Sequence, residues 1–306
     1  MQYEGEQFGP LFFVFAALHG NEHAGVEALK LVHKMLEVEP ITNPIFEFKG
    51  KVVGLIGNIS AVEKGVRYID EDLNRMWENE NVQHIMAKSN PSCNSEEKEL
   101  KSLIDTINNE IEKYKPEEIY VLDLHTTSSH GGIFAIPNTD SRSLELAQNL
   151  HTPVILNMLS GISGTTLHYF NSSLPIEAST TSVTFEAGQH NDKLSVNRCI
   201  AAVVNCLRSI GCVKDTDVEN IHDQLLISYS KNLPRLSKLI YKHEIEPEDG
   251  FVMESGFENF DAVKKGRILG HDHSGHVRAS ADGLLLMPLY QKKGNEGFFI
   301  IQPIKH

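Results

Sequence analysis

A histidine or a glutamate directly follows each of three short apolar stretches in this chain. The stretches and the residues that follow them are Leu11–Leu18 with His19 and Glu22, Ile119–Leu124 with His125, and Val183–Phe185 with Glu186. Two imidazoles and one carboxylate, completed by a water in the fourth position, form the ligand set of a catalytic zinc ion. The sequence therefore predicts one zinc ion per chain, bound by His19, Glu22 and His125.

Glu186 is then the candidate for moving a proton, because it is not needed as a ligand. A zinc ion polarises a carbonyl group and makes hydroxide from water near neutral pH. A carboxylate beside the ion can take the proton from that water and pass it on. A further acid, Asp123, precedes His125 by two residues, and we expect it to orient that histidine from outside the ligand set.

Two arginines, Arg67 and Arg75, stand in the stretch RYIDEDLNR, which also holds three acids. One interpretation is that the arginines form ion pairs with Asp70, Glu71 and Asp72. The other is that they bind substrate carboxylates or a developing oxyanion, since a guanidinium offers paired N–H donors. The sequence leaves both interpretations open.

The apolar stretches have the composition of strands that are buried on both faces of a sheet. Helical patterns separate them at Ala24–Leu36, after a capping box formed by Asn94 and Glu97, and at Leu194–Ile210. Strands that alternate with helices predict an α/β fold, with a mostly parallel or mixed sheet flanked by helices. Ligands of such sheets bind beyond the carboxyl ends of the strands, where the candidate residues stand.

The residue pattern of the sequence changes after about Asp217. Eight glycines between Gly250 and Gly297 interrupt short apolar runs, which is typical of short antiparallel strands and turns. We therefore expect a catalytic domain over residues 1–217 and a smaller C-terminal β-rich domain over residues 218–306.

Composition and charge limit the kinds of partner. The chain has 28 Lys and Arg against 41 Asp and Glu, a net charge of −13, and no basic run, so we expect neither nucleic acid nor membrane as a partner. Its longest apolar run is far shorter than the roughly 20 residues that span a membrane. The four cysteines show no CxxC spacing, which is typical of reduced thiols in a cytoplasmic protein. The expected partner is a small molecule, and the oligomeric state is left open.

Four motifs occur in one order and together resemble a known family. They are HGNE at 19–22, GN with GVRYIDEDLNR at 57–75, VLDLHTTS at 121–128 and VTFEAGQH at 183–190. In this order they resemble the succinylglutamate desuccinylase/aspartoacylase family, which has the zinc carboxypeptidase-like fold. The region with Ala281-Asp282-Gly283 and Pro288 to Lys293 resembles the smaller β domain of that family.

The resemblance implies a zinc-dependent amidohydrolase that cleaves a small N-acyl amino acid into a carboxylate and a free amino acid. Matched residue by residue, it implies that His19, Glu22 and His125 bind the zinc ion. The other matched residues are Glu186 as general base and acid, Arg67 as the residue that polarises the scissile carbonyl, Asn74 and Arg75 as binders of the substrate carboxylate, and Tyr290 as a residue that closes over the substrate.

The sequence departs from the aspartoacylase branch at one point. That branch resembles this chain except for an additional arginine shortly before the catalytic glutamate, which binds the side-chain carboxylate of acetylaspartate. Here no Lys or Arg occurs from Ser143 to Asp192. Since a buried carboxylate without a charged partner is costly by several kcal/mol, we do not expect acetylaspartate to be the best substrate.

Two other histidine patterns allow different metal sites. His19 and His23 fit an HxxEH pattern, in which Glu22 would be the base, but Gly20 and Asn21 directly after a strand disfavour the helix that this pattern needs. The tract HDHSGH at 271–276 could hold a second ion, although turn glycines around it favour a solvated hairpin.

Three functions therefore compete at this stage. The first is the zinc-dependent deacylase of N-acyl amino acids, the second a zinc carboxypeptidase that acts on short peptides, and the third a non-catalytic carboxylate-binding relative. A nucleotide cofactor is not supported, because the sequence contains neither a P-loop nor a GxGxxG motif.

Overall fold

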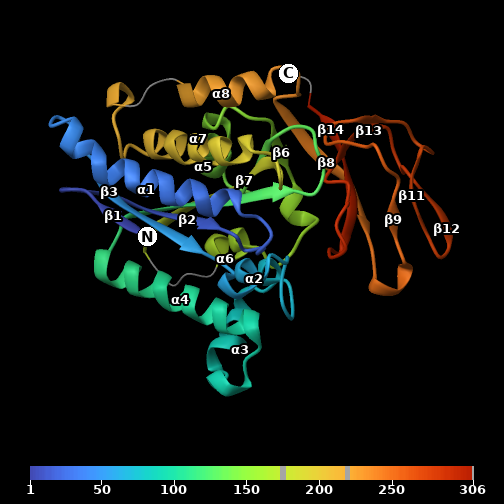
Figure 1. Cartoon of the computed structure of the whole chain (residues 1–306), viewed down its shortest axis with the longest axis horizontal. Helices are drawn as coiled ribbons and strands as arrows, with labels where there is room; N and C mark the ends of the chain where they lie inside the picture. The colour runs from blue at the N-terminus through green and yellow to red at the C-terminus, as the bar shows by residue number, and fades with distance from the viewer. Residues whose placement is uncertain (173–176, 218–220, 305–306) are drawn as a thin grey trace.

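The computed structural model describes residues 1–172, 177–217 and 221–304, and the centre of this described part is a sheet of 11 strands. Their order is β1-β3-β2-β4-β7-β5-β6-β8-β14-β13-β10 (Figure 1). The bounds are β1 Gln2–Glu4, β2 Gln7–Ala16, β3 Lys49–Ile56, β4 Glu118–Thr127, β5 Phe134–Pro137, β6 Val154–Leu156, β7 Ser179–Gln189, β8 Leu236–Glu244, β10 Ala262–Val263, β13 Gly283–Leu286 and β14 Glu296–Pro303. A smaller sheet of order β12-β11-β9 consists of β9 Val252–Met253, β11 Ile268–Asp272 and β12 Gly275–Arg278.

The middle of the large sheet is parallel, because β3, β2, β4 and β7 pair side by side in one direction. β5 pairs antiparallel with β7, and the pairs of β14 with β8 and β13 are also antiparallel. The predicted α/β fold with a mixed sheet is confirmed. The C-terminal strands extend the same sheet through the pairing of β6 with β8, so the division at residue 217 stays a prediction.

Helices cover both faces of the sheet. Their bounds are α1 Ala24–Thr42, α2 Ile59–Lys64, α3 Asn79–Ala87, α4 Ser95–Tyr114, α5 Ser141–Asn149, α6 Thr166–Ser172, α7 Leu194–Ser209 and α8 Ile221–Ser230. α1, α5, α7 and α8 lie on one side of the strands, and α2, α3, α4 and α6 lie on the other (Figure 1). Among the described helices, none has the length and apolar composition needed to cross a membrane.

The strand β2 explains why both faces need helices. Successive side chains of a strand point to opposite faces of the sheet. Phe12, Val14 and Ala16 enter the core beneath α1 and α7. Leu11, Phe13 and Phe15 enter the core beneath α4. All six are fully buried, as expected of a continuous apolar run in a parallel sheet.

The capping box at the start of α4 forms as predicted. The side chain of Asn94 accepts a hydrogen bond from the Glu97 N–H, and Glu97 accepts one from the Asn94 N–H. α1 runs further than expected, to Thr42, with Pro40 inside its last turns. Because proline has no backbone N–H, it removes one hydrogen bond near the end of the helix. The last turn is still closed by a hydrogen bond from the Asn43 N–H to the Glu39 carbonyl.

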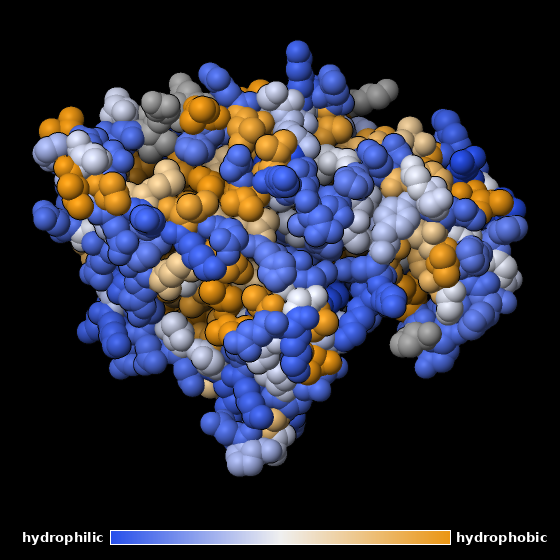
Figure 2. Space-filling view, viewed as in Figure 1, coloured by the Kyte–Doolittle hydropathy of each residue, from blue (hydrophilic) through white to orange (hydrophobic). Residues whose placement is uncertain are grey.

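The four cysteines are buried and form no disulfide, in agreement with their expected state as core thiols. Some apolar side chains do reach the surface, among them Leu31, Met35 and Ile41 along α1. Figure 2 shows hydrophobic residues gathered on that side of the molecule, whereas the tip around α3 is mainly hydrophilic.

Candidate active site

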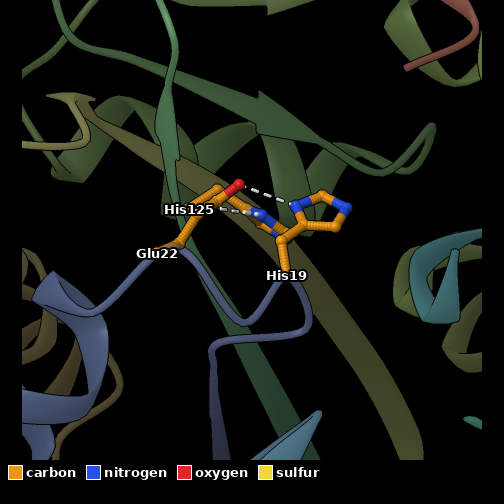
Figure 3. Close-up of side chains that lie close together, drawn as sticks. All are labelled: His19, Glu22 and His125. Atoms are coloured by element: carbon orange, nitrogen blue, oxygen red, sulfur yellow. Dashed lines mark hydrogen bonds and ion pairs between the residues drawn. The ribbon is translucent and has the colours of Figure 1, made fainter. Parts of the chain in front are cut away.

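The carboxyl ends of β2, β4 and β7 bring the predicted metal ligands together. β4 lies between β2 and β7, and its pairing places His125 beside Glu186. His19 and Glu22 stand on the turn that leads from β2 into α1. Figure 3 shows both imidazoles directed toward the carboxylate of Glu22. Parallel strands end at one edge of a sheet, so residues far apart in the chain meet there.

The distances fit a single ion. His19 Nδ1 lies 2.7 Å from Glu22 Oε1, and His125 Nδ1 lies 3.1 Å from Glu22 Oε2. All three residues are buried, and one possible ligand atom from each lies within 4.8 Å of the others. Bonds from zinc to nitrogen or oxygen are about 2 Å long, so atoms at these separations can surround one ion. Two imidazoles and a carboxylate are also the donors that zinc prefers.

The outer nitrogen of each histidine faces a second carboxylate. His19 Nε2 lies 3.2 Å from Asp72 Oδ1, and His125 Nε2 lies 3.1 Å from Asp123 Oδ2. A carboxylate that holds the outer N–H leaves the inner nitrogen free to bind a metal. The contact of Asp123 agrees with the sequence prediction. The contact of Asp72 with His19 was not foreseen, since the sequence suggested only an ion pair with an arginine.

These carboxylates make the ligand site favour positive charge. Burial alone would raise the pKa of Glu22, but the charges of His19 and His125 hold it well below its usual range. Burial opposes protonation of His125, yet Asp123 and Glu22 together raise its pKa well above the ordinary value. A divalent cation bound here would supply positive charge next to these carboxylates.

Glu186 is buried in the same cavity. Within the described chain its Oε2 atom has no hydrogen-bond partner, and the residue is only 4% exposed. Burial raises the pKa of Glu186 to about 8, and nearby Glu22 adds to the rise while His125 opposes it. A carboxyl group that titrates near neutral pH can both accept and return a proton.

The arginine segment 67–75 reaches the site because it packs against the turn after β2. The Gly20 N–H donates to the Arg67 carbonyl at 2.9 Å. A Cβ atom on Gly20 would lie 2.3 Å from the Ala61 backbone in α2, so the close packing of this turn against α2 requires glycine. Arg67 donates from Nε and Nη2 to Asp72 Oδ2, at 3.1 and 2.8 Å. The ion-pair interpretation therefore holds for Arg67, although its side chain also lines the cavity.

Asn74 and Arg75 also line the cavity, at the short helix Leu73–Arg75. Asn74 Nδ2 lies 3.3 Å from His125 Nε2. Arg75 Nη2 donates to both carboxylate oxygens of Glu296, at 2.9 Å each. Arg75 thus pairs with an acid from β14, and not with the acids of its own segment that the sequence suggested.

A buried glutamate that the sequence analysis missed holds this segment in place. Glu96, in the first turn of α4, accepts hydrogen bonds from the backbone N–H groups of Ile69, Asp70 and Glu71, at 2.7, 3.0 and 3.3 Å. It also accepts one from Asn58 Nδ2 at 2.9 Å. An acid in the first turn of a helix is ordinarily explained by the helix dipole, so the sequence carried no signal for this role.

Replacing Glu96 with alanine is expected to lower the free energy of unfolding by about 2–4 kcal/mol. The buried Asn58 amide and three partly buried backbone N–H groups would lose their acceptor, and a buried donor left unsatisfied costs about 1–3 kcal/mol. Urea unfolding at an unchanged m-value measures the loss. Glu112→Ala, at an exposed position of the same helix, is the matched control and is expected to stay within about 0.5 kcal/mol. Equal stability of the two variants would contradict the assigned role.

One cavity contains all the predicted site residues except Tyr290. The polar side is formed by the metal-ligand group, Glu186, Asn74 and the two arginines. The apolar part of the lining includes Ile136, Met158, Leu159, Ile162, Met287 and Phe299, which belong to one hydrophobic cluster. The cavity therefore combines a charged end with a wall that suits an uncharged group.

The side chain of Tyr290 points away from this cavity. Its hydroxyl donates toward the carbonyls of Glu254 and Phe257, at 2.9 and 3.0 Å, and accepts from the Phe257 N–H at 2.9 Å. The next residue, Gln291, lines the cavity and accepts a hydrogen bond from Asn21 Nδ2 at 3.2 Å. The loop between β13 and β14 therefore covers the site here with Gln291, and the contact of Tyr290 with substrate stays a prediction.

The alternative histidine patterns do not form metal sites in the structure. His23 is exposed at the start of α1. Within the described residues, the group of His19, Glu22 and His125 is the one whose donor atoms converge. His271 pairs with His276 across the antiparallel strands β11 and β12, so the predicted hairpin is confirmed.

Comparison with known proteins agrees with this geometry. The sequence model of the succinylglutamate desuccinylase/aspartoacylase catalytic domain matches residues 9–209. The chain belongs to this family. The matched residues include β2, β4 and β7 with every candidate metal ligand and Glu186, so the predicted family is confirmed.

Similar sequences carry several related names. A succinylglutamate desuccinylase of Pseudoalteromonas atlantica is 24% identical over 288 residues, which cover 88% of this chain and 73% of that protein. An aspartoacylase of Xenopus tropicalis is 36% identical over 121 residues, or 39% of this chain, and the match spans only 34% of the frog protein. An N-acyl-aromatic-L-amino acid amidohydrolase of the same frog is 33% identical over 146 residues, covering 46% of this chain and 42% of the relative.

Solved structures share the fold over nearly the whole chain. Murine aminoacylase 3 superposes with a TM-score of 0.63 at 17% identity, covering 98% of this chain and 97% of that one. The ectoine utilization protein EutE of Ruegeria pomeroyi, solved with bound product, superposes with a TM-score of 0.66 at 16% identity. The match covers 98% of this chain and 87% of that one. At this level of identity the likeness concerns the fold, which extends through the C-terminal strands.

Proposed function

We propose that the protein is a zinc-dependent amidohydrolase that removes the acyl group from a small N-acyl amino acid. The observation that carries the proposal is the convergence of two buried histidines and one buried glutamate beside a second glutamate, Glu186, whose Oε2 has no partner among the described residues. His19, Glu22 and His125 would hold one zinc ion. When bound there, the ion supplies Lewis-acid polarisation of a carbonyl oxygen and acidifies water.

Glu186 moves the proton in this reaction. It accepts a proton from the water whose oxygen attacks the amide carbon, and it returns that proton to the leaving nitrogen as the carbon–nitrogen bond breaks. Burial and the raised pKa of Glu186 give the carboxylate the proton affinity that both steps need. The products are a carboxylate and a free amino acid.

The other polar residues hold the substrate. Arg67, which lines the cavity and is fixed by Asp72, donates to the amide carbonyl oxygen as negative charge develops on it. Asn74 and Arg75 bind the carboxylate of the amino acid, since a guanidinium matches a carboxylate in shape and charge. The names of the similar sequences, all hydrolases of acylated amino acids, support this substrate class.

The amino-acid side chain is not expected to be acidic. No Lys or Arg occurs from Ser143 to Asp192, and much of the remaining cavity lining is apolar. A second substrate carboxylate would therefore be buried without a cationic partner, at a cost of several kcal/mol.

A hydrolysis panel tests the proposed function. The protein, purified without chelator, is assayed on acetyl, formyl and succinyl derivatives of acidic, neutral and aromatic amino acids, and on dipeptides. We expect release of the free amino acid from acylated neutral substrates, and loss of that activity when a chelator removes the metal. Preferential cleavage of dipeptides would favour the carboxypeptidase. Binding of carboxylates without turnover would favour a non-catalytic relative.

A further inference from the structure

A carboxylate of the chain itself forms an ion pair with Arg75 inside the cavity. Arg75 Nη2 lies 2.9 Å from both oxygens of Glu296, and Arg75 Nη1 donates to the Asn74 carbonyl at 2.8 Å. The side chains of Arg75 and Glu296 are 22% and 14% exposed, and both line the cavity. Both terminal nitrogens of the guanidinium are therefore engaged before any substrate arrives.

The second arginine of the cavity also has a carboxylate partner, but that partner is held differently. Asp72, which pairs with Arg67, also accepts the Asn74 N–H at 2.9 Å and lies 3.2 Å from His19 Nε2. In the described chain, Glu296 has hydrogen bonds from Arg75 alone. Asp72 is thus a fixed part of the site, whereas the Glu296 carboxylate is held by its hydrogen bonds from Arg75, with the nearby charge of Arg67 as a further attraction.

The position of Glu296 in the fold would let another carboxylate replace its side chain at Arg75. It is the first residue of β14 and follows the loop from β13, in which Gly294 has a φ of +155° that favours glycine. Lys293, in the same loop, also contacts the arginine segment. Its Nζ atom donates to the Tyr68 carbonyl at 2.9 Å and lies 3.8 Å from the centre of the Tyr68 ring. The loop therefore rests on the arginine segment through charged contacts at the cavity.

We propose that Glu296 is a specificity-determining residue that competes with the substrate carboxylate for Arg75. In the free enzyme Glu296 holds Arg75, and a carboxylated substrate binds only when it takes the place of this side chain. The inference rests on the proposed function, because it assigns Arg75 to the substrate carboxylate. A second carboxylate next to an unmoved Glu296 would be repelled as a like charge, so the two anions exclude one another.

The competition predicts a measurable gain in affinity when Glu296 loses its charge. If the ion pair holds Arg75 for roughly nine-tenths of the time, the apparent affinity for a carboxylate is reduced about ten-fold. Glu296→Gln retains the size of the side chain and removes the charge. We therefore expect KM for the best N-acyl amino acid to fall about ten-fold, with kcat changed less than about two-fold.

Calorimetry separates this inference from the proposed function. The dissociation constant of an N-acyl amino acid, and of its C-terminal amide, is measured on the metal-loaded protein carrying Glu186→Gln, with and without Glu296→Gln. We expect Glu296→Gln to tighten binding of the acid about ten-fold and to leave the uncharged amide unchanged. If the wild-type protein hydrolyses nothing, the proposed function fails, while this binding comparison still decides the role of Glu296.

The control is Glu244→Gln, because Glu244 faces Glu296 in the pairing of β8 with β14, is exposed, and does not line the cavity. Glu244→Gln is expected to leave the dissociation constants of both the acid and the amide unchanged. Weaker binding of the acid in Glu296→Gln would show that Glu296 orients Arg75 for the substrate, and would overturn the competition. Unchanged binding, an equal gain for acid and amide, or no binding to any of the proteins would overturn it as well.

Discussion

Glu186→Gln is expected to reduce kcat by about 10²–10⁴-fold while the protein still binds one metal ion per chain. The substitution retains the shape of the buried side chain and removes its ability to accept a proton, which is the contribution that general acid–base catalysis makes. Glu186 lies outside the group of three converging donors, so the ligands are unaffected. Steady-state kinetics and metal content measured on the same preparation check both parts of the prediction.

The matched control is Glu177→Gln, because Glu177 is exposed and precedes the same strand, β7. It is expected to retain full kcat and full metal content. Near-normal turnover of Glu186→Gln would remove Glu186 from the mechanism. Loss of the metal together with turnover would instead make Glu186 a ligand, and the proton would need another carrier.

The reactive centre could be predicted because strand ends are visible in the sequence. Leu11–Leu18 is apolar without interruption, since both faces of β2 are covered by helices. A polar residue directly after such a run must stand at the edge of the sheet. His125 and Glu186 lie inside β4 and β7, near their carboxyl ends, because both strands continue past the apolar stretches, and parallel strands bring these ends together. The pattern therefore predicts that His19, Glu22 and His125 converge, as they do in the structure.

The partner of Arg75 could not be predicted, because it depends on contacts between distant parts of the chain, whereas Arg67 pairs with Asp72 of its own segment as one interpretation of the sequence suggested. Glu296 stands opposite Arg75 only because β14 joins the large sheet through β8 and β6. Similarly, Glu96 reaches the backbone of residues 69–71 because of how α4 packs beside that segment. Composition and spacing favoured the acids nearest in sequence, and local spacing carries no information on long-range pairing.

The orientation of Tyr290 shows the limit of matching motifs residue by residue. The motif places a tyrosine near the cavity, and the loop between β13 and β14 is indeed there, with Gln291 lining the site. The tyrosine hydroxyl, however, finds three backbone partners in the segment 254–257 and turns toward them. A motif identifies the loop, whereas local hydrogen bonds decide which of its side chains lines the cavity in this structure, and the contact of Tyr290 with substrate stays a prediction.

Glu22→Ala is expected to weaken metal binding at least about 100-fold and to abolish hydrolysis, whereas His23→Ala leaves both intact. Glu22 contacts both histidines of the group, while its neighbour His23 is exposed and outside the group. Even partners that only support a ligand change metal affinity 10- to 100-fold, so removal of a ligand should cost more. Competition with a chromophoric chelator measures the affinity.

The two substitutions together decide between the two arrangements of the HGNEH segment. In an HxxEH site, His23 would be a ligand and Glu22 only the base, so His23→Ala would lose the metal and Glu22→Ala would retain it. That reversed pattern would overturn the ligand set. Glu22 also accepts the Thr126 N–H at 2.8 Å, so Glu22→Gln, which retains the hydrogen-bonding shape, is measured in parallel. If Glu22→Gln stays folded by circular dichroism and still loses the metal, the loss is due to coordination, because the backbone contact remains satisfied.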